Sequence, residues 1–345
     1  MGLLRKRPAT DGAKPVSLAL QGGGAHGAFQ WGVLDRLLEY GGLEIQSITA
    51  ASAGAMNAVA LVSGMIEGGP EGARTRLESF WKAVSQGSGG VFGENFMTRL
   101  ATDWFTNSPA YSYLQTLQPA MSPYDFNPLN LNPLRDVLRE QIDFKAIREQ
   151  SPIDLFIAAT AVRTSEAKLF HAAELTAEHI LASACLPDVF QAVEIDGEPY
   201  WDGGYLANPP IWPLVECRAR DVLMLLLNPL VSKGTPRSTA EIMDRLNEIG
   251  FNASVVAELR TIAVVQDLIK RGLLKAGAGY MTLRFHMIAA DGRLGDLTLS
   301  SKANTGWSFL LDLKKRGREA ADEWLKDHLA QVGSQSSVDL GKAFL

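Results

Sequence analysis

Three short segments of the 345-residue chain carry residue types that could act together in acyl transfer. They are the glycine-rich loop 22–27, the serine Ser52 among small residues, and Asp202 followed by Gly203 and Gly204. A serine hydroxyl needs a base to become a good nucleophile. The oxyanion formed on a carbonyl needs fixed N–H donors. The three segments together therefore suggest a serine acyl hydrolase.

The glycine loop also fits a second class of protein. Its spacing, Gly22-x-Gly24-x-x-Gly27, matches the dinucleotide-binding fingerprint, which follows a strand and opens a helix. That fingerprint expects an acidic residue at the end of the second strand, but Glu44 precedes the strand's apolar part and the strand leads to Ser52. Backbone N–H groups at a helix N-terminus can equally bind an oxyanion. The candidate oxyanion donors are Gly22, Gly23, Gly24, Ala25, His26 and Gly27.

Ser52 is flanked only by small residues, as the sharp turn of a nucleophile elbow requires. The elbow neighbours are Ala50, Ala51, Ala53 and Gly54. The usual motif has glycine two residues before the serine, where this chain has Ala50. Alanine is tolerated there if the local φ is negative and is costly if φ is positive. The alternative is that Ser52 is the N-cap of a helix rich in small residues.

The base decides the type of hydrolase. A Ser-His-Asp triad needs a histidine on a loop near the serine, after an acidic partner. None of the five histidines lies in such a position. They are His26, His171, His179, His286 and His328. Asp202 instead leaves a predicted hairpin and enters a Gly-Gly turn. A partly desolvated carboxylate can serve as a base alone. The alternative is an ordinary turn aspartate.

Alternating strands and helices place these residues. A strand at 16–20 leads into the glycine loop, an amphipathic helix ends at Gly41-Gly42, and a second strand at 45–49 leads to Ser52. Further elements up to residue 230 continue the pattern, which predicts a mostly parallel, doubly wound sheet. We predict helices at 74–84, from 133, after Thr176 and from Pro209-Pro210, strands at 154–161, 168–170 and 222–227, and a hairpin around Asp196-Gly197.

The chain divides into an N-terminal tail at 1–15, a catalytic domain at 16–228 and a helical C-terminal region at 229–345. Residues 85–132 are irregular and rich in aromatic residues and methionine, which indicates a cap over the site; a permanently packed insertion is the alternative. In the C-terminal region, Ser238 and Glu241 form a capping box for a helix to about 274. A strand at 280–288 and a helix at 305–329 follow.

Composition excludes several classes. A formal net charge of −5 argues against a generic nucleic-acid binder. The two cysteines, Cys185 and Cys217, are not spaced as metal ligands and suggest no disulfide framework, and we expect neither a metal nor a cofactor. No signal peptide is evident either, so we expect a cytoplasmic protein. Residues 45–66 carry no charge and could span a bilayer. Their polar and small residues favour a buried strand, turn and helix instead.

The motifs taken together resemble the patatin-like phospholipases. The resemblance rests on the glycine loop 22–27, the segment 51–55 with Asn57, the run 182–187 and the turn 202–204, in the same order over about residues 16–228. It implies a three-layer α/β fold with a mostly parallel central sheet flanked by helices. It also implies a Ser52–Asp202 dyad without histidine, and an oxyanion hole in the glycine loop. Two positions depart from the family pattern: Ala50 replaces glycine, and His26 stands where arginine or lysine is usual.

We therefore expect a serine esterase that cleaves carboxylic esters of acyl lipids through a covalent acyl-enzyme. Acyl transfer, depolymerisation of a storage polyester, and dinucleotide binding without hydrolysis remain alternatives. The expected partners are an acyl lipid or other acyl ester and, peripherally, a membrane surface; nucleic acid is not expected. The C-terminal helices could pair with a second copy of the chain or cover the sheet.

Overall fold

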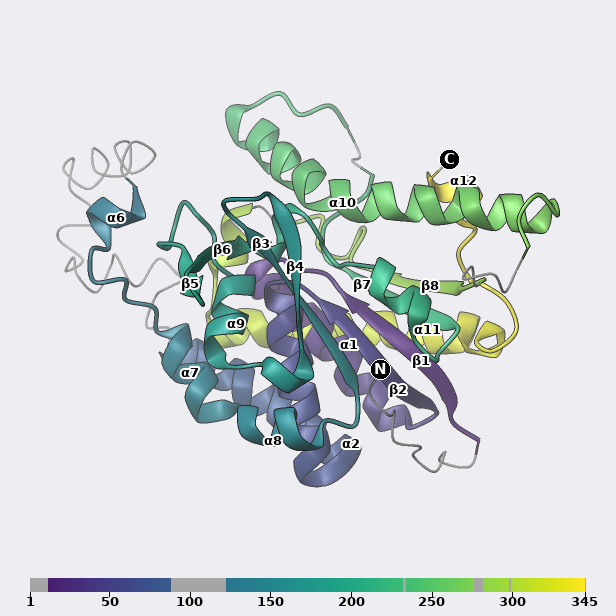
Figure 1. The fold of residues 1–345 in the computed structure, drawn as a ribbon, viewed down its shortest axis with the longest axis horizontal. Helices are drawn as coiled ribbons and strands as arrows, with labels where there is room; N and C mark the ends of the chain where they lie inside the picture. The colour runs from purple at the N-terminus through teal and green to yellow at the C-terminus, as the bar shows by residue number, and fades with distance from the viewer. Residues whose placement is uncertain (1–11, 88–121, 232–233, 276–281, 298, 345) are drawn as a thin grey trace.

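The computed structural model describes residues 12–87, 122–231, 234–275, 282–297 and 299–344 (Figure 1). At its centre lies an eight-stranded sheet in the order β5-β6-β3-β2-β1-β7-β8, with β4 also paired to β3. The strands are β1 (Lys14–Leu20), β2 (Leu43–Ala50), β3 (Asp154–Ala161), β4 (Glu166–His171), β5 (Val193–Ile195), β6 (Glu198–Asp202), β7 (Asp221–Leu226) and β8 (Arg284–Ala289).

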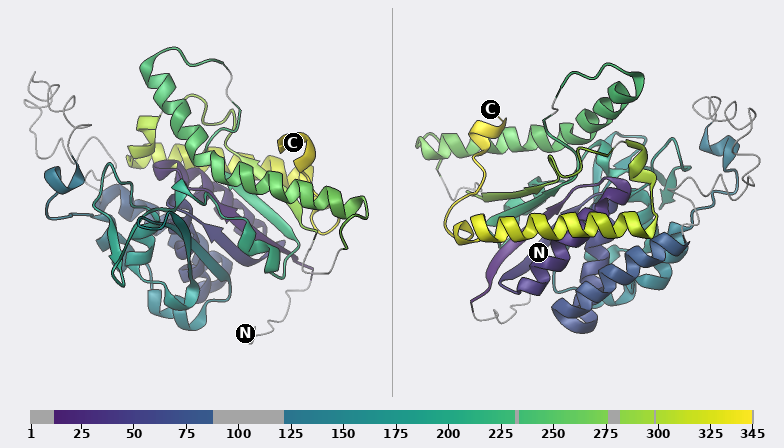
Figure 2. Two further views of the ribbon diagram at one scale, coloured as in Figure 1. Left: turned by 45° about the horizontal axis from the view of Figure 1, so that its top comes forward. Right: turned by 180° about the vertical axis from the view of Figure 1, so that it is seen from behind.

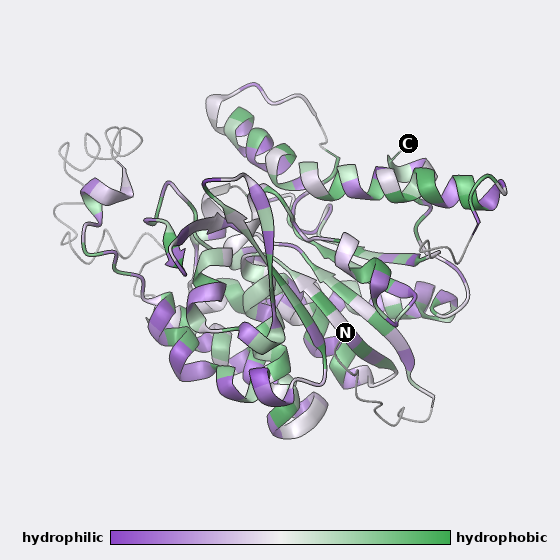
Figure 3. Ribbon diagram, in the orientation of Figure 1, coloured by the Kyte–Doolittle hydropathy of each residue, from purple (hydrophilic) through white to green (hydrophobic). Residues whose placement is uncertain are grey.

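The middle of the sheet is parallel. β3, β2, β1, β7 and β8 pair with one another in parallel, whereas β4 and β6 pair antiparallel to β3, and β5 antiparallel to β6. All six residues of β7 are buried, as expected for a parallel strand covered on both faces. The predicted mostly parallel sheet is confirmed, and Figure 3 shows its central strands as largely hydrophobic.

Helices cover both faces and complete three layers (Figures 1 and 2). Alternate residues of β7 enter two different cores: Leu223 and Leu225 face one, and Val222, Met224 and Leu226 face the other. The first core contains residues of α1 (Gly27–Tyr40), α2 (Ala53–Gly87), α7 (Leu134–Gln141), α8 (Phe144–Gln150), α9 (Ala177–Ser183) and α11 (Trp307–His328). The second contains residues of α10 (Thr239–Lys270) and α12 (Leu340–Phe344).

The C-terminal region is part of the same core. β8 extends the sheet beside β7. α11 packs against α1, on the face of the sheet that is turned toward the viewer in the right-hand view of Figure 2. Two glycines allow this close approach, because a Cβ at Gly32 would overlap the Lys314 carbonyl and one at Gly317 would overlap the Phe29 carbonyl. α1 and the C-terminal helix α11 are thus joined by backbone-to-backbone packing.

Several elements differ from their predicted form. α2 continues from Ala53 to Gly87 and is interrupted only by non-helical residues at Gly68 and Gly69, whereas the sequence predicted a separate short helix at 74–84. The helix predicted from Pro209-Pro210 is instead a short 3-10 helix, η5, which begins only at Trp212 and ends at Glu216. The N–H groups of Ile211 and Trp212 donate to Glu258 on α10, so its start is set by a contact distant in sequence. The predicted strand 280–288 is β8, at Arg284–Ala289.

Most of the predicted cap, residues 88–121, lies outside the described residues; at its edges, α2 ends at Gly87 and a short helix, α6 (Pro123–Phe126), follows. Within the described part of the chain, no helix is both long and apolar enough to cross a membrane. Residues 45–66 form most of β2, the turn at Ser52 and the first part of α2.

Candidate active site

Ser52 occupies a strained turn between β2 and α2. Its φ is 52°, in the left-handed region that non-glycine residues rarely adopt. Ala50 is the last residue of β2 and pairs with Leu20 and Ile157, so it has an extended conformation that alanine adopts readily. The residue under strain is Ser52 itself. The missing motif glycine therefore does not prevent the elbow from forming.

Two glycines let the chain close tightly around this turn. A Cβ at Gly54 would overlap the Leu20 carbonyl, and a Cβ at Gly22 would lie 2.7 Å from Ser52 Cβ. The glycine loop and Ser52 are therefore in direct contact, as expected for loops at the same edge of a parallel sheet. The Ser52 backbone N–H donates to Ser183, at the end of α9, with distances of 3.1 Å to its carbonyl and 3.0 Å to its hydroxyl oxygen.

Asp202 ends β6 and is fully buried. Its backbone N–H donates to the Cys185 carbonyl (2.8 Å), and its carbonyl accepts from the Thr160 hydroxyl (2.8 Å). Its Oδ1 accepts from the Gly204 N–H at 2.7 Å. A Cβ at Gly203 would overlap the Ala158 carbonyl, so this glycine is needed for the turn to lie against β3. The backbone hydrogen bonds hold the residue in place, and the Gly204 N–H holds one oxygen of its carboxylate.

Burial raises the pKa of Asp202 to about 7, while the Gly204 N–H and the Ser52 hydroxyl, both donors, favour the ionised form and Asp188 opposes it. Oδ2 is buried and has no complete hydrogen bond with any described residue. The Ser52 hydroxyl therefore lies close enough to favour the ionised carboxylate but does not form a well-aligned hydrogen bond with Oδ2. Catalytic hydrogen bonds are often long or poorly aligned when no substrate is bound. One carboxylate oxygen remains available to accept a proton.

The glycine loop passes from β1 into a short 3-10 helix, η1 (Gly24–His26), and then into α1. The backbone N–H groups of the six residues predicted as oxyanion donors differ in whether they already have a partner. The Gly22 N–H donates to Asn208 Oδ1 (2.6 Å), the His26 N–H to the Gly23 carbonyl (3.3 Å), and the Gly27 N–H to the η1 carbonyls. These three groups are used internally. Among the described residues, the N–H groups of Gly23, Gly24 and Ala25 have no partner, as is usual at a helix start.

His26 is neutral at physiological pH. Burial, together with the nearby Lys302 ammonium, lowers the pKa of its imidazole to about 3. Its Nε2 lies 2.7 Å from the Ser301 hydroxyl, in the 3-10 helix η6 (Leu299–Ala303) of the C-terminal region. The cation that acts on this loop residue is Lys302, whose backbone carbonyl also lies against Gly24. No local sequence pattern predicts its position there.

Two of the other histidines form hydrogen bonds elsewhere in the fold. His286 Nε2 lies 2.9 Å from Asp221 Oδ1, at the start of β7 and so at the sheet edge opposite Ser52. His179 Nδ1 accepts from the Thr176 N–H at the start of α9. Within the described residues, no histidine forms a hydrogen bond with Ser52 or Asp202. Nor do any three His, Cys, Asp or Glu side chains there lie in an arrangement that could hold a metal ion.

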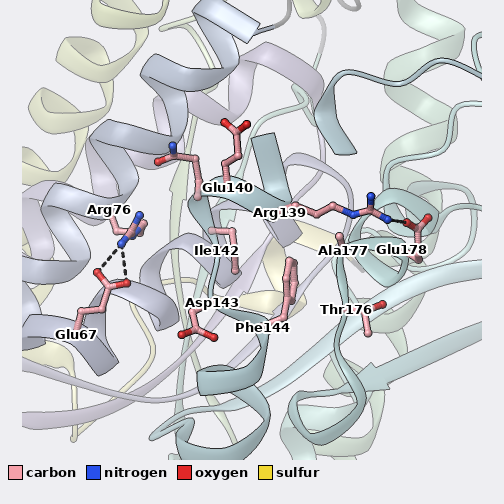
Figure 4. A pocket seen from close by; sticks show the side chains of 11 residues that line it. Glu67, Arg76, Arg139, Glu140, Ile142, Asp143, Phe144, Thr176, Ala177 and Glu178 are labelled. Carbon is pink, nitrogen blue, oxygen red and sulfur yellow. Dashed lines mark hydrogen bonds and ion pairs between the residues drawn. The ribbon is translucent and has the colours of Figure 1, made fainter. Parts of the chain in front are cut away.

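A polar groove on the surface, shown in Figure 4, is lined by none of these residues. It is lined by parts of α2, α7, α8 and the start of α9, and both of its arginines are paired, Arg76 with Glu67 and Arg139 with Glu178. Glu67 lies fifteen positions (67 − 52) after Ser52 along α2, about 20 Å away at the rise of a helix. This groove is therefore separate from the candidate active site.

The comparison that decides the family is a match of residues 18–215, more than half of the chain, to the model of the patatin-like phospholipases. The chain belongs to the patatin-like phospholipase family. Members of this family are lipid acyl hydrolases. No curated protein sequence matches the chain.

Two solved structures are similar to this patatin-like protein at low identity. VipD from Legionella pneumophila shares 16% identity over 92% of this chain and 67% of its own, with a TM-score of 0.41. A chain of the ExoU–SpcU complex from the type III secretion system of Pseudomonas aeruginosa shares 19% identity, with a TM-score of 0.36. The alignment covers 91% of the patatin-like chain but 53% of that chain, about half its length.

Proposed function

We propose that this patatin-like protein is a serine esterase that cleaves acyl lipids by means of Ser52 and Asp202. The observation that supports this most strongly is the position of Ser52. It lies in a left-handed turn, in contact with the glycine loop and beside a buried carboxylate with one oxygen unpaired. A merely structural serine N-cap would not need to be strained, and an ordinary turn aspartate would not be fully buried.

In the proposed reaction, Ser52 Oγ attacks the ester carbonyl and its proton passes to Asp202. The carbonyl oxygen becomes an oxyanion, which accepts hydrogen bonds from the Gly23 and Gly24 N–H groups. As the tetrahedral intermediate collapses, the C–O bond breaks and Asp202 returns the proton to the leaving alcohol. Water then attacks the acyl-Ser52 carbonyl and gives a proton to Asp202. As the bond between the acyl carbon and Ser52 Oγ breaks, Asp202 returns that proton to Ser52 Oγ and the fatty acid leaves.

The pKa of about 7 for Asp202 suits this role. A carboxylate of ordinary pKa would be a weak base at neutral pH, whereas one raised by burial accepts a proton from Ser52 at lower free-energy cost. The α2 N-terminus at Ala53 adds a favourable dipole for negative charge near Ser52. No bound cofactor is needed for any of these steps.

A fluorophosphonate probe and a lipid panel test the proposal together. We expect the probe to label folded wild-type protein at Ser52, and phospholipid or neutral acyl esters to be hydrolysed. Ser52→Ala should lose both labelling and turnover. Ser63→Ala, which changes a buried serine farther along α2, is the matched control and should keep both.

Three outcomes would contradict the proposal. Labelling that persists in Ser52→Ala would place the nucleophile elsewhere. Full turnover in Asp202→Asn would remove Asp202 as the base. Tight NAD binding by an unlabelled, inactive protein would instead favour the dinucleotide-binding alternative.

A further inference from the structure

Side-chain amides hold both peptide groups that meet at Gly22. The Gly22 N–H donates to Asn208 Oδ1 at 2.6 Å, and the Gly22 carbonyl accepts from Asn228 Nδ2 at 3.2 Å. Both asparagines are buried, with exposures of 0% for Asn208 and 2% for Asn228. The backbone on either side of Gly22 is therefore held in a fixed orientation by side chains distant in sequence.

The second of these contacts sets the direction of an oxyanion donor. The Gly22 carbonyl and the Gly23 N–H belong to one planar trans peptide, so they point in opposite directions. Asn228 holds the carbonyl end of that peptide. The Gly23 N–H must then point away from Asn228, and it has no partner among the described residues.

Asn228 is in turn bound by a lysine. Lys302 Nζ donates to Asn228 Oδ1 at 2.7 Å and to Asn247 Oδ1, on α10, at 2.8 Å. Among the described residues no carboxylate lies within ion-pair distance of this ammonium, although Asp244 and Glu248 of α10 act on it from farther away. The Lys302 carbonyl also lies against the glycine loop, since a Cβ at Gly24 would be 2.5 Å from it.

We propose that Lys302 is a positioning residue for the oxyanion hole and acts through Asn228. A cation at Oδ1 polarises the amide and makes Nδ2–H a stronger donor to the Gly22 carbonyl. The polarised Gly22–Gly23 peptide is then both better fixed and a better N–H donor at Gly23. This inference rests on the proposed esterase function, and it assigns a role in that function to a residue outside the part of the chain that matches the family.

We call the chain of contacts from Lys302 through Asn228 to the Gly22–Gly23 peptide the relay. Because it depends on the charge of Lys302, its effect on kcat should depend on pH. Burial lowers the pKa of its ammonium to about 8, while Glu248 and Asp244 raise it. The neighbouring groups titrate elsewhere: His26 of η1 near 3, and Asp202 near 7 on the acidic side of the profile. Deprotonation of Lys302 removes the cation, so kcat should fall as pH rises through about 8.

Three variants test the relay, with kcat and KM measured on 4-nitrophenyl butyrate from pH 6 to 10. Lys302→Met should lower kcat about 10-fold to 100-fold at pH 7, less than the loss of an oxyanion donor itself, with KM changed little. Its alkaline decline should disappear. Lys302→Arg, which keeps the charge at every pH tested, should hold kcat within about threefold and also lose the alkaline decline.

Asn228→Ala breaks the second link. If both residues act in one relay, the double variant Lys302→Met/Asn228→Ala should be no slower than the slower single variant, rather than showing the product of the two losses. Lys315→Met is the matched control, because Lys315 is exposed on α11; its kcat and pH profile should equal those of the wild type.

The outcomes separate the inference from the function on which it rests. Wild-type turnover that depends on Ser52, combined with unchanged kcat and pH profile in folded Lys302→Met, would overturn the relay alone. If Lys302→Met does not fold, a wild-type alkaline decline that persists unchanged in Lys302→Arg would overturn it. A wild-type protein that hydrolyses no acyl ester would overturn the proposed function and the relay with it.

Discussion

The backbone N–H of Ser52 donates to both oxygens of Ser183, the carbonyl at 3.1 Å and the hydroxyl at 3.0 Å. Two residues later, the Cys185 carbonyl accepts from the backbone N–H of Asp202 at 2.8 Å. One segment at the end of α9 therefore holds the proposed nucleophile and the proposed base. It keeps them in register although the two are 150 residues apart (202 − 52).

Ser183→Ala tests whether this contact supports catalysis. The substitution removes the hydroxyl acceptor but leaves the carbonyl, so the left-handed turn at Ser52 is held less firmly. We expect kcat to fall about 10-fold and the free energy of unfolding to fall by about 1 kcal/mol, the usual contribution of one hydrogen bond. Ser63→Ala is the control: it should show a similar or smaller loss in urea unfolding with wild-type kcat. Equal kcat in both variants would contradict the role of Ser183.

The raised pKa of Asp202 predicts the acidic side of the activity profile. Asp202 must be ionised to accept the Ser52 proton, so kcat/KM should rise with pH and reach half its plateau near pH 7. A profile of kcat/KM between pH 5 and 8 on a soluble ester measures this. A midpoint near 4, the ordinary value for an aspartate, would show that the carboxylate is not desolvated as the structure indicates.

The same pKa predicts how Asp202 affects stability. The folded protein binds this proton more tightly than the unfolded chain, whose carboxyl titrates near 3.8. The stabilisation by protonated Asp202 is therefore full below about pH 4 and is lost as pH rises through about 7. Asp202→Asn, which is uncharged at every pH, should raise Tm by a few degrees at pH 8 and hardly at pH 4. Thermal melts of both proteins at the two pH values measure this. An equal gain in Tm at pH 4 and pH 8 would contradict it.

Ala50→Gly restores the usual elbow motif and tests whether its glycine matters here. Ala50 is extended within β2 and fully buried, so glycine relieves no strain and adds chain entropy to the unfolded state. We expect a loss of about 0.5–1 kcal/mol in unfolding free energy with no gain in kcat. A several-fold gain in kcat would mean that the alanine does distort the turn at Ser52.

Gly32→Ala tests whether the C-terminal region is needed for the fold. A Cβ at this position would overlap the Lys314 backbone, which cannot move without shifting α11 from α1. We expect a loss of about 3 kcal/mol or more, measured by chemical unfolding. Gly250→Ala, on the exposed side of α10 with open space around it, should be neutral or stabilising by up to about 1 kcal/mol. Equal stability of the two variants would show that α11 is not tightly docked.

Local patterns were enough to predict the order of the elements. The apolar run at 222–227, the Asp196-Gly197 turn and the capping box at Ser238 each depend on neighbours within a few positions, and each formed as expected. The continuation of α2 past Gly68 and Gly69 to Gly87 was not predicted, because whether a helix continues after a break depends on its packing against the rest of the fold.

The sequence by itself determined the mostly parallel sheet, and it brought Ser52 and the glycine loop to one edge, because both follow neighbouring parallel strands. Only the tertiary structure decided which N–H groups are free and which cation lies beside the loop. Those facts depend on Asn208, Asn228, Ser183 and Lys302, whose contacts reach the site from 131 to more than 180 positions away in the chain. Side-chain hydrogen bonds over such separations have no period or spacing that a sequence can reveal.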